Sequence, residues 1–245
     1  MILCWSKEMN EKLYIIIPAY NEEENIENCV NDWYPVIEKH NSDGQSRLVI
    51  INDGSKDGTY KKLCKLGENH PLLQPLTKEN GGHGATLLYG YKYAISNGAD
   101  FIFQTDSDGQ TDPSEFEKFW DGRLEYDALI GERNKRGDGK SRKFVENVVC
   151  ILLKTIFGIR VKDANAPYRL MKADLMEKYI DRLPSDFNIP NIMFTTFFVY
   201  YKEKVSFIPI SFKPRQGGKN SINVKKIIKI GLKAIADFKE LKKTM

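Results

Sequence analysis

The sequence predicts an α/β protein with an open, mostly parallel sheet flanked by helices. Short apolar runs rich in β-branched residues alternate with helix-forming segments through the first half of the chain. Several of these runs end in clusters of polar residues. In open parallel sheets ligands bind across the carboxyl ends of the strands, so the clusters at 18–22, 52–55 and 106–110 are expected to face one crevice.

The elements follow from this alternation and from turn residues between the runs. Strands are predicted over 13–17, 47–51, 72–76, 99–103, 127–131 and 205–210. Helices are predicted after Asn21, after Thr59 and over 85–97, 113–120, 144–157, 172–180, 192–201 and 223–243. Segment 132–143 is expected to be a mobile basic loop, and 163–169 a turn that returns to the crevice.

Composition favours a globular protein, because 41% of the 245 residues are hydrophobic and 29% are charged. The expected partition is a domain over 1–212 and a basic appendage over 213–245 that ends in an amphipathic helix. The appendage has ten Lys/Arg and two Asp/Glu, a net charge of +8, whereas the first 212 residues sum to −4. An anionic membrane surface or phosphate groups would suit the appendage, and a solvated helix face is the alternative.

Other sequence features bear on the cellular setting. The four cysteines form no Cys-x-x-Cys pair, so neither a zinc site nor a disulfide framework is indicated, and a reducing cytoplasm fits best. No apolar stretch approaches the roughly 20 residues of a membrane span. Residues 1–10 lack the apolar core of a signal peptide.

A candidate metal site follows the apolar run 99–103. In an extended segment residues i, i+2 and i+4 point the same way, so Asp106, Asp108 and Gln110 could offer three oxygen ligands to Mg²⁺ or Mn²⁺. The alternative is an acidic turn that caps the next helix, with Asp112 as N-cap and Pro113 as first residue. Asp106 and Asp108 are not needed for that role.

Four motifs, taken together and in order, resemble those of inverting family 2 glycosyltransferases with the GT-A fold, a Rossmann-like arrangement. The likeness is greatest to dolichyl- and polyprenyl-phosphate sugar transferases. The motifs are Ile17-Pro18-Ala19-Tyr20-Asn21-Glu22, Asn52-Asp53-Gly54-Ser55-Lys56-Asp57-Gly58-Thr59, Asn80-Gly81-Gly82-His83-Gly84-Ala85 and Asp106-Ser107-Asp108-Gly109-Gln110. Looser likenesses cover 131–133, 163–169 and 215–221. Departures from the family pattern occur at Asn52, His83, Pro167 and Asn191.

The resemblance implies two substrate sites. The nucleotide-sugar would be bound by Pro18, Ala19, Tyr20, Glu22, Asp53, Gly81, Ala85, Asp106 and Ser107. The acceptor phosphate would be bound by Arg133, Arg142, Arg169, Arg215 and Ser221, with Asp106, Asp108 and Arg133 acting in catalysis. Simpler roles are open for some of these residues: helix-dipole stabilisation for Glu22 and surface charge for the arginines.

The function expected is metal-dependent transfer of a hexose, with inversion, from a UDP- or GDP-sugar to a polyprenyl phosphate. The protein would be peripheral at the cytoplasmic face of the membrane, held there by helix 144–157 and by the C-terminal helix through its Ile227, Ile230, Ala234, Phe238 and Leu241 face. The alternative for both helices is that the apolar face packs on the domain, with the lysines of the C-terminal helix in solvent. One rival is a family 2 enzyme that uses a glycan hydroxyl in surface polysaccharide synthesis. Another is a non-catalytic membrane or nucleic-acid-binding module, although no nucleic acid is expected, because the basic charge is confined to two stretches.

Overall fold

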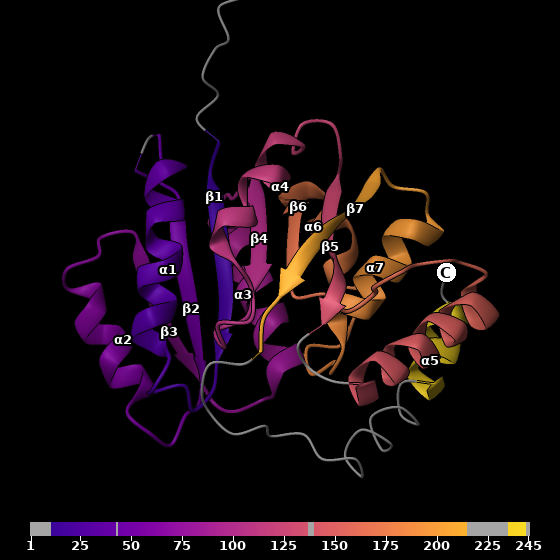
Figure 1. Cartoon of the computed structure of the whole chain (residues 1–245), viewed down its shortest axis with the longest axis horizontal. Helices are drawn as coiled ribbons and strands as arrows, with labels where there is room; N and C mark the ends of the chain where they lie inside the picture. Colours follow the sequence, from indigo (N-terminus) through magenta and orange to yellow (C-terminus); the bar gives the residue numbers. More distant parts are fainter. Residues whose placement is uncertain (1–10, 43, 137–139, 215–234, 244–245) are drawn as a thin grey trace, which may run out of the picture.

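A computed structural model of the chain describes residues 11–42, 44–136, 140–214 and 235–243, which form a seven-stranded sheet between two layers of helices (Figure 1). The strands are β1 (Leu13–Ala19), β2 (Arg47–Asp53), β3 (Leu73–Lys78), β4 (Phe101–Thr105), β5 (Ala128–Arg136), β6 (Tyr168–Lys172) and β7 (Val205–Phe212). The helices are α1 (Ile26–Lys39), α2 (Thr59–Gly67), α3 (His83–Ser96), the short 3₁₀ turn η1 (Pro113–Glu115), α4 (Glu117–Asp121), α5 (Lys140–Phe157), α6 (Ala173–Ile180) and α7 (Pro190–Tyr200). Residues 235–243 are also helical.

The sheet order β3-β2-β1-β4-β6-β5-β7 confirms the predicted mostly parallel α/β class. Strand β6, missing from the prediction, runs antiparallel to both β4 and β5. The expected turn at 163–169 therefore ends one residue before this strand, at Pro167. Because β6 reverses direction, its start lies at the same edge of the sheet as the ends of β4, β5 and β7.

Side chains of the central strands alternate between two apolar layers, as the period of a strand requires. In β1, Leu13, Ile15 and Ile17 belong to the layer covered by α1, whereas Tyr14 and Ile16 belong to the layer covered by α3. Figure 1 shows α1 and α4 in front of the sheet, with α3, α6 and α7 behind it. Burial on both faces explains why the central strands read as continuous apolar runs.

The prediction of a basic loop over 132–143 is wrong for residues 132–136, which belong to strand β5. Strand β5 continues through Arg136, because β7 supplies a parallel partner as far as the Arg136–Phe212 pair, with a register shift between Arg133 and Lys135. Helix α5 then begins at Lys140, earlier than the predicted residue 144. Arg133 consequently lies on a paired strand.

The described part of the C-terminal helix packs on the domain, which corrects the expectation that Phe238 faces a membrane. Phe238 is fully buried, and its ring lies 6.0 Å from that of Phe157 on α5. Leu241 also packs against this core. The apolar residues Ile227, Ile230 and Ala234 lie outside the described residues. Among those described, no helix combines the length and apolar character needed to cross a bilayer.

Candidate active site

The loops that follow β1 and β2 are hydrogen-bonded to each other at the carboxyl edge of the sheet. The Asn21 amide donates to Ser55 Oγ at 2.9 Å, and Asn21 Oδ1 accepts from the Lys56 amide at 2.9 Å. Asn21 has a φ of 53°, a left-handed conformation that asparagine tolerates better than most residues. The Glu22 amide donates to Thr59 Oγ1 at 2.9 Å. Two of the three predicted segments therefore form one rigid wall.

Asp53 joins this wall to the glycine-rich loop before α3. Its Oδ1 accepts from Lys78 Nζ at 2.7 Å and from the Gly81 amide at 2.9 Å, while Oδ2 accepts from the Gly82 amide at 2.9 Å. The side chain is nearly fully buried. In this conformation Asp53 orders the glycine loop, and a direct contact with a base or ribose stays a prediction.

Gly84 is needed for a close approach between two backbone segments. A Cβ added there would lie 2.1 Å from the carbonyl oxygen of Phe187, a separation that no side chain permits. This contact sets the first turn of α3 against the segment that leads into α7. Glycine at position 84 therefore has a packing reason that does not involve a nucleotide.

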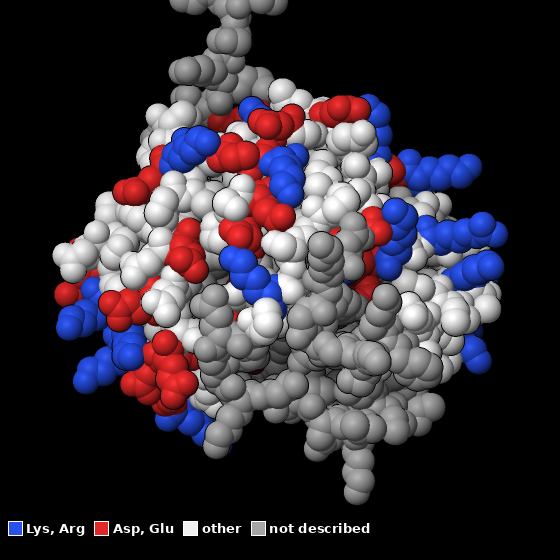
Figure 2. Space-filling view, viewed as in Figure 1, with Lys and Arg blue, Asp and Glu red and all other residues white. Residues whose placement is uncertain are grey.

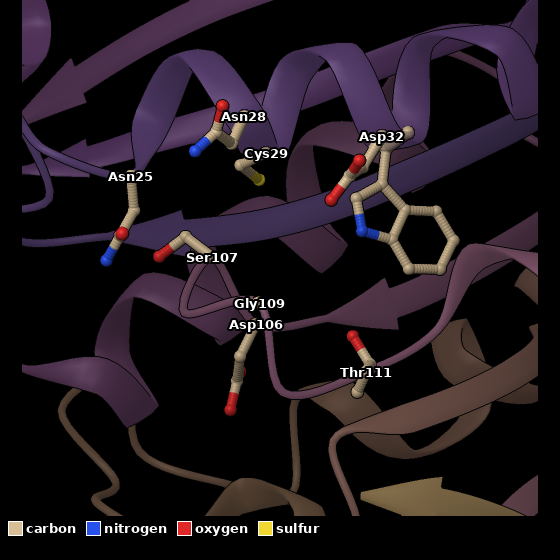
Figure 3. A pocket seen from close by; sticks show the side chains of 9 residues that line it. Asn25, Asn28, Cys29, Asp32, Asp106, Ser107, Gly109 and Thr111 are labelled. Carbon is tan, nitrogen blue, oxygen red and sulfur yellow. The ribbon is translucent and has the colours of Figure 1, made fainter. Parts of the chain in front are cut away.

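The acidic loop begins directly after β4, which ends at Thr105. Residues 107–109 and 111 form bends, so the expected extended geometry of this segment is wrong. Asp106 and Asp108 are both half-buried, and Asp106 Oδ1 accepts from Gln104 Nε2 at 3.2 Å. In Figure 3 the Asp106 side chain points away from α1, whereas Ser107 lies beneath the first turn of that helix.

A small cavity separates the acidic loop from α1 (Figure 3). Its volume is about 10 Å³, which is room for about one water molecule and far too little for a nucleotide. Burial raises the pKa of Asp32, which lines this cavity. The residues around it are Asn25, Asn28, Cys29, Asp32, Trp33, Asp106, Ser107, Gly109 and Thr111.

Gln110 fastens the acidic loop to the end of β7. Its Nε2 donates to the Lys213 carbonyl at 2.9 Å, and its own carbonyl accepts from the Lys213 amide at 2.8 Å. The side chain is buried. Its role as a third metal ligand stays a prediction, now without the geometric support that an extended segment would have given.

The chemistry of Asp106 and Asp108 suits a hard divalent cation. Two carboxylates at the carboxyl edge provide the oxygen ligands that Mg²⁺ and Mn²⁺ prefer, with water or phosphate completing the shell. Within the described ranges no group of three or more His, Cys, Asp and Glu residues could hold a metal by itself. His83 Nε2 lies 3.9 Å from Asp106 Oδ1, and its side chain is 53% exposed. Asp106 and Asp108 therefore fit a site that the donor phosphates would complete.

A buried chain of hydrogen bonds leads from Asp106 into the protein interior. Gln104 Oε1 accepts from Asn191 Nδ2 at 3.0 Å, and Asn191 Oδ1 accepts from the Tyr91 hydroxyl at 3.1 Å. Sequence reasoning missed Gln104 and Tyr91, and it noted Asn191 only as a departure from the family pattern. A signal for Gln104 was present, because it is a polar residue in an apolar strand directly before the acidic motif.

Arg133, in the second half of β5, is held by two carboxylates. Its Nε donates to Asp163 Oδ2 at 2.6 Å, and Nη2 donates to Asp163 Oδ1 at 2.8 Å and Glu146 Oε2 at 3.2 Å. The guanidinium also lies 5.1 Å from the ring centre of Phe212. No described residue accepts a hydrogen bond from Nη1, so this nitrogen is the part of Arg133 that could meet a phosphate.

Arg169 is fully buried and cannot reach an acceptor phosphate in this conformation. It donates to the carbonyls of Ala164, Ala166 and Asn191 and to Thr195 Oγ1, at 3.0–3.4 Å. Burial lowers the pKa of Arg169 to about 10, so it remains a cation at neutral pH. Its observed role is to fix the turn before β6 against α7, in place of the predicted phosphate contact.

The remaining predicted residues differ in accessibility. Tyr20 is 40% exposed, and Gly81 is also exposed, while Ala85 is half-buried. Pro18, Ala19, Glu22 and Ser107 are buried, and Glu22 Oε2 accepts from Asn25 Nδ2 at 2.8 Å. Arg215 and Ser221, and the side chain of Arg142, lie outside the described residues. Tyr20 and Gly81 are therefore the predicted nucleotide contacts most open to a ligand.

Charges of both signs are interspersed on the face shown in Figure 2. Acidic side chains lie across the middle of its described surface, with lysines and arginines between them and around the rim. Much of the predicted basic charge belongs to 215–234, outside the described residues.

Residues 14–180 match the model of the family described as glycosyl transferase family 2. The chain belongs to this family. It is therefore a glycosyltransferase, and the expected class of enzyme is confirmed. The match covers all the motifs of the carboxyl edge described above, from Pro18 to Arg169.

Relatives of known name include enzymes that use polyprenyl phosphates. A UDP-N-acetylglucosamine–dolichyl-phosphate N-acetylglucosaminyltransferase from Methanococcus voltae is 37% identical over 124 residues, which cover 45% of this chain and 47% of the relative. An undecaprenyl-phosphate mannosyltransferase from Micrococcus luteus is 23% identical over 222 residues, covering 86% and 88%. The first match thus spans about half of the relative's length.

A solved structure confirms the GT-A-type fold. The glucosyl-3-phosphoglycerate synthase of Mycobacterium tuberculosis, crystallised with Mn²⁺, UDP and phosphoglyceric acid, superimposes with a TM-score of 0.70. The superposition covers 95% of this chain and 78% of the synthase, at 16% sequence identity. At this identity the likeness concerns the fold alone.

Asp112 stabilises the acidic loop at its far end. As predicted, it caps η1, accepting from the Ser114 amide at 3.0 Å with Pro113 at the first position. Its Oδ2 also pairs with Lys213 Nζ at 2.8 Å. The hydrogen bonds from Lys213 and Ser114 lower the pKa of Asp112 to about 2.

We expect Asp112→Ala to lower the free energy of unfolding by about 0.5–2 kcal/mol at pH 7, the usual effect of losing an N-cap. Because the folded pKa is depressed, this contribution is present above the unfolded pKa of about 4 and is lost as the pH falls towards 2. Urea denaturation from pH 7 to pH 2.5 measures the difference. Glu125→Ala, at an exposed acid, is the control. If the difference in unfolding free energy between Asp112→Ala and the parent does not change with pH, the role assigned to the ionised Asp112 carboxylate is wrong.

Proposed function

We propose that this protein transfers a hexose from a UDP- or GDP-sugar to a polyprenyl phosphate at a membrane surface, with inversion and with the help of a divalent cation. The observation that carries the proposal is the pair of half-buried carboxylates, Asp106 and Asp108, at the carboxyl edge of the sheet and within the residues that match glycosyl transferase family 2. The names of the relatives support a polyprenyl phosphate as the acceptor class.

The donor would lie along the wall formed by the loops after β1 and β2. Tyr20 offers an exposed ring beside this wall, which is suited to contact with a base. The donor phosphates would reach Asp106 and Asp108, where a bound Mg²⁺ or Mn²⁺ would offset the charge that develops on the leaving nucleotide diphosphate.

The acceptor proposal rests on the chemistry of the residue at 191. A hydroxyl acceptor needs a base, and family 2 enzymes often have an acid near this position. Asn191 carries an amide with no basic oxygen, and both ends of the amide are engaged in buried hydrogen bonds. A lipid monophosphate has a second pKa of about 6 and is already anionic, so it needs no such base.

Arginine side chains would hold the acceptor phosphate, with Arg133 on β5 and the donor wall after β1 and β2. Nη1 of Arg133 is one candidate donor. Arg142, Arg215 and Ser221 stay predictions as further contacts. Arg169 would act indirectly, by fixing the turn that carries Asp163, the partner of Arg133.

Peripheral attachment at the cytoplasmic face is proposed to involve α5. Val148 and Ile151 are 39% and 61% exposed on this helix, and Lys154 is exposed one turn further on. An apolar strip beside a lysine fits a helix that lies in the membrane interface. The basic tail would add attraction to anionic lipids, about 1 kcal/mol per lysine near the surface.

The first test is a transfer assay with radiolabelled UDP- and GDP-hexoses. We expect transfer to polyprenyl phosphate, loss of transfer on chelation, and no turnover by Asp108→Ala with its circular dichroism spectrum unchanged. The control is Asp121→Ala, at an exposed acid on α4. Label that appears in a glycan and not in the lipid phosphate would favour the rival, a family 2 enzyme that uses a glycan hydroxyl. Full activity after exhaustive chelation would refute the metal site.

A second test concerns Arg133. Arg133→Lys keeps a cation beside Asp163 and Glu146 but removes Nη1, so the fold should survive while the KM for polyprenyl phosphate rises roughly tenfold or more. Donor affinity, measured by calorimetry without acceptor, should not change. Arg123→Lys, at a distant arginine paired with Glu11, is the matched control. Equal losses in donor affinity would move Arg133 to the donor site.

A third test is flotation with anionic phosphatidylglycerol vesicles. We expect the parent to float at low salt and to be released by high salt, and Ile151→Ser to bind roughly tenfold more weakly, because a buried isoleucine contributes about 1.5–3 kcal/mol. Leu124→Ser removes a side chain of similar exposure, 60%, away from α5 and should have no effect. A parent protein that stays off the vesicles would refute the membrane surface as the site of action.

A further inference from the structure

The hydrogen-bond chain behind Asp106 has a defined direction. The Tyr91 hydroxyl donates to Asn191 Oδ1, Asn191 Nδ2 donates to Gln104 Oε1, and Gln104 Nε2 donates to Asp106 Oδ1. Tyr91 and Gln104 are fully buried and Asn191 is 3% exposed. In both Asn191 and Gln104, the amide oxygen therefore accepts from the partner further inside the protein. The amide nitrogen of each donates to the next residue towards Asp106.

The direction depends on an amide at position 191. Gln104 can present either its oxygen or its nitrogen to Asp106, since the two ends of the amide have the same shape. Asn191 Nδ2 needs an acceptor, so it holds the Gln104 oxygen inward and leaves the Gln104 nitrogen facing the carboxylate. An aspartate at 191 would accept at both oxygens, and Gln104 would then turn its oxygen towards Asp106.

We infer that Tyr91, Asn191 and Gln104 are positioning residues that orient the Asp106 carboxylate for the divalent cation. The inference rests on the proposed metal site. A donor on Oδ1 fixes the rotation of the carboxylate and leaves Oδ2, to which no described residue hydrogen-bonds, for the cation. Residues that orient a metal ligand in this way commonly change metal affinity 10- to 100-fold when they are altered.

Asn191→Asp is the most direct test, because it replaces the side-chain NH₂ group by an oxygen and keeps the side-chain volume. The buried charge that it introduces has a counterion close by, since Arg169 Nη1 already lies 3.1 Å from the Asn191 carbonyl oxygen. Tyr91→Phe is the second variant, and it removes only the innermost hydroxyl, at the far end of the chain from Asp106. Thr196→Val is the matched control: Thr196 is fully buried on the same helix, but its hydroxyl bonds to the Ile192 carbonyl and not to the chain.

The measurement is a titration of Mn²⁺ followed by electron paramagnetic resonance of the free ion. The titration contains either UDP or GDP. The nucleotide chosen is the one that, together with Mn²⁺, raises the melting temperature of the parent protein. Asn191→Asp should raise the Kd for Mn²⁺ about 10- to 100-fold. Tyr91→Phe should raise it roughly twofold to tenfold, and Thr196→Val should leave it unchanged. Nucleotide affinity in EDTA should be the same in all four proteins.

Each alternative outcome has a distinct meaning. If Asn191→Asp binds Mn²⁺ as tightly as the parent, the positioning role is refuted and the proposed function is unaffected. If the parent binds no Mn²⁺, both the positioning role and the metal site are refuted. An equal loss in Thr196→Val would refute the positioning role by showing a general packing effect. If Asn191→Asp does not fold, Tyr91→Phe decides, and an unchanged Kd in that variant refutes the inference.

Discussion

The buried guanidinium of Arg169 is the interaction on which the carboxyl edge depends. A fully buried cation needs hydrogen-bond acceptors for its N–H groups, and here three carbonyls and one hydroxyl supply them. Two of the carbonyls belong to the turn before β6, at Ala164 and Ala166, and one belongs to Asn191 at the start of α7. The requirement to satisfy Arg169 thus fixes both the turn and the helix relative to β4.

Two consequences follow for the proposed site. The turn places Asp163 where it pairs with Arg133, and α7 places Asn191 where it reaches Gln104 beside Asp106. Two arginines are therefore fixed at the edge of the sheet that carries the acidic loop, where Asp106 and Asp108 are half-buried. Carboxylates and a nucleotide diphosphate repel each other, which is the physical reason for proposing a divalent cation between them.

The likeness to a synthase of 16% identity shows how little of the sequence the fold requires. An apolar pattern of the right period and volume is sufficient for the sheet and its two helical layers. Individual polar residues carry more information about chemistry. His83 and Asn191 both depart from the family pattern, and both approach Asp106, directly or through Gln104. Differences in donor or acceptor among relatives are expected to arise at such positions.

The sequence by itself determined the α/β class, the central strands, the η1 cap at Asp112 and the family. These depend on local features: apolar runs, turn residues and short ordered motifs. Strand β6 and the length of β5 could not be predicted, because their polar residues become strand only through pairing with β4 and β7. The roles of Gln110, Arg169 and Phe238 likewise depend on partners about 20 to 100 positions away, Lys213, Asn191 and Phe157. Local pattern records which residues can be buried or charged, and only tertiary structure decides which partner each of them meets.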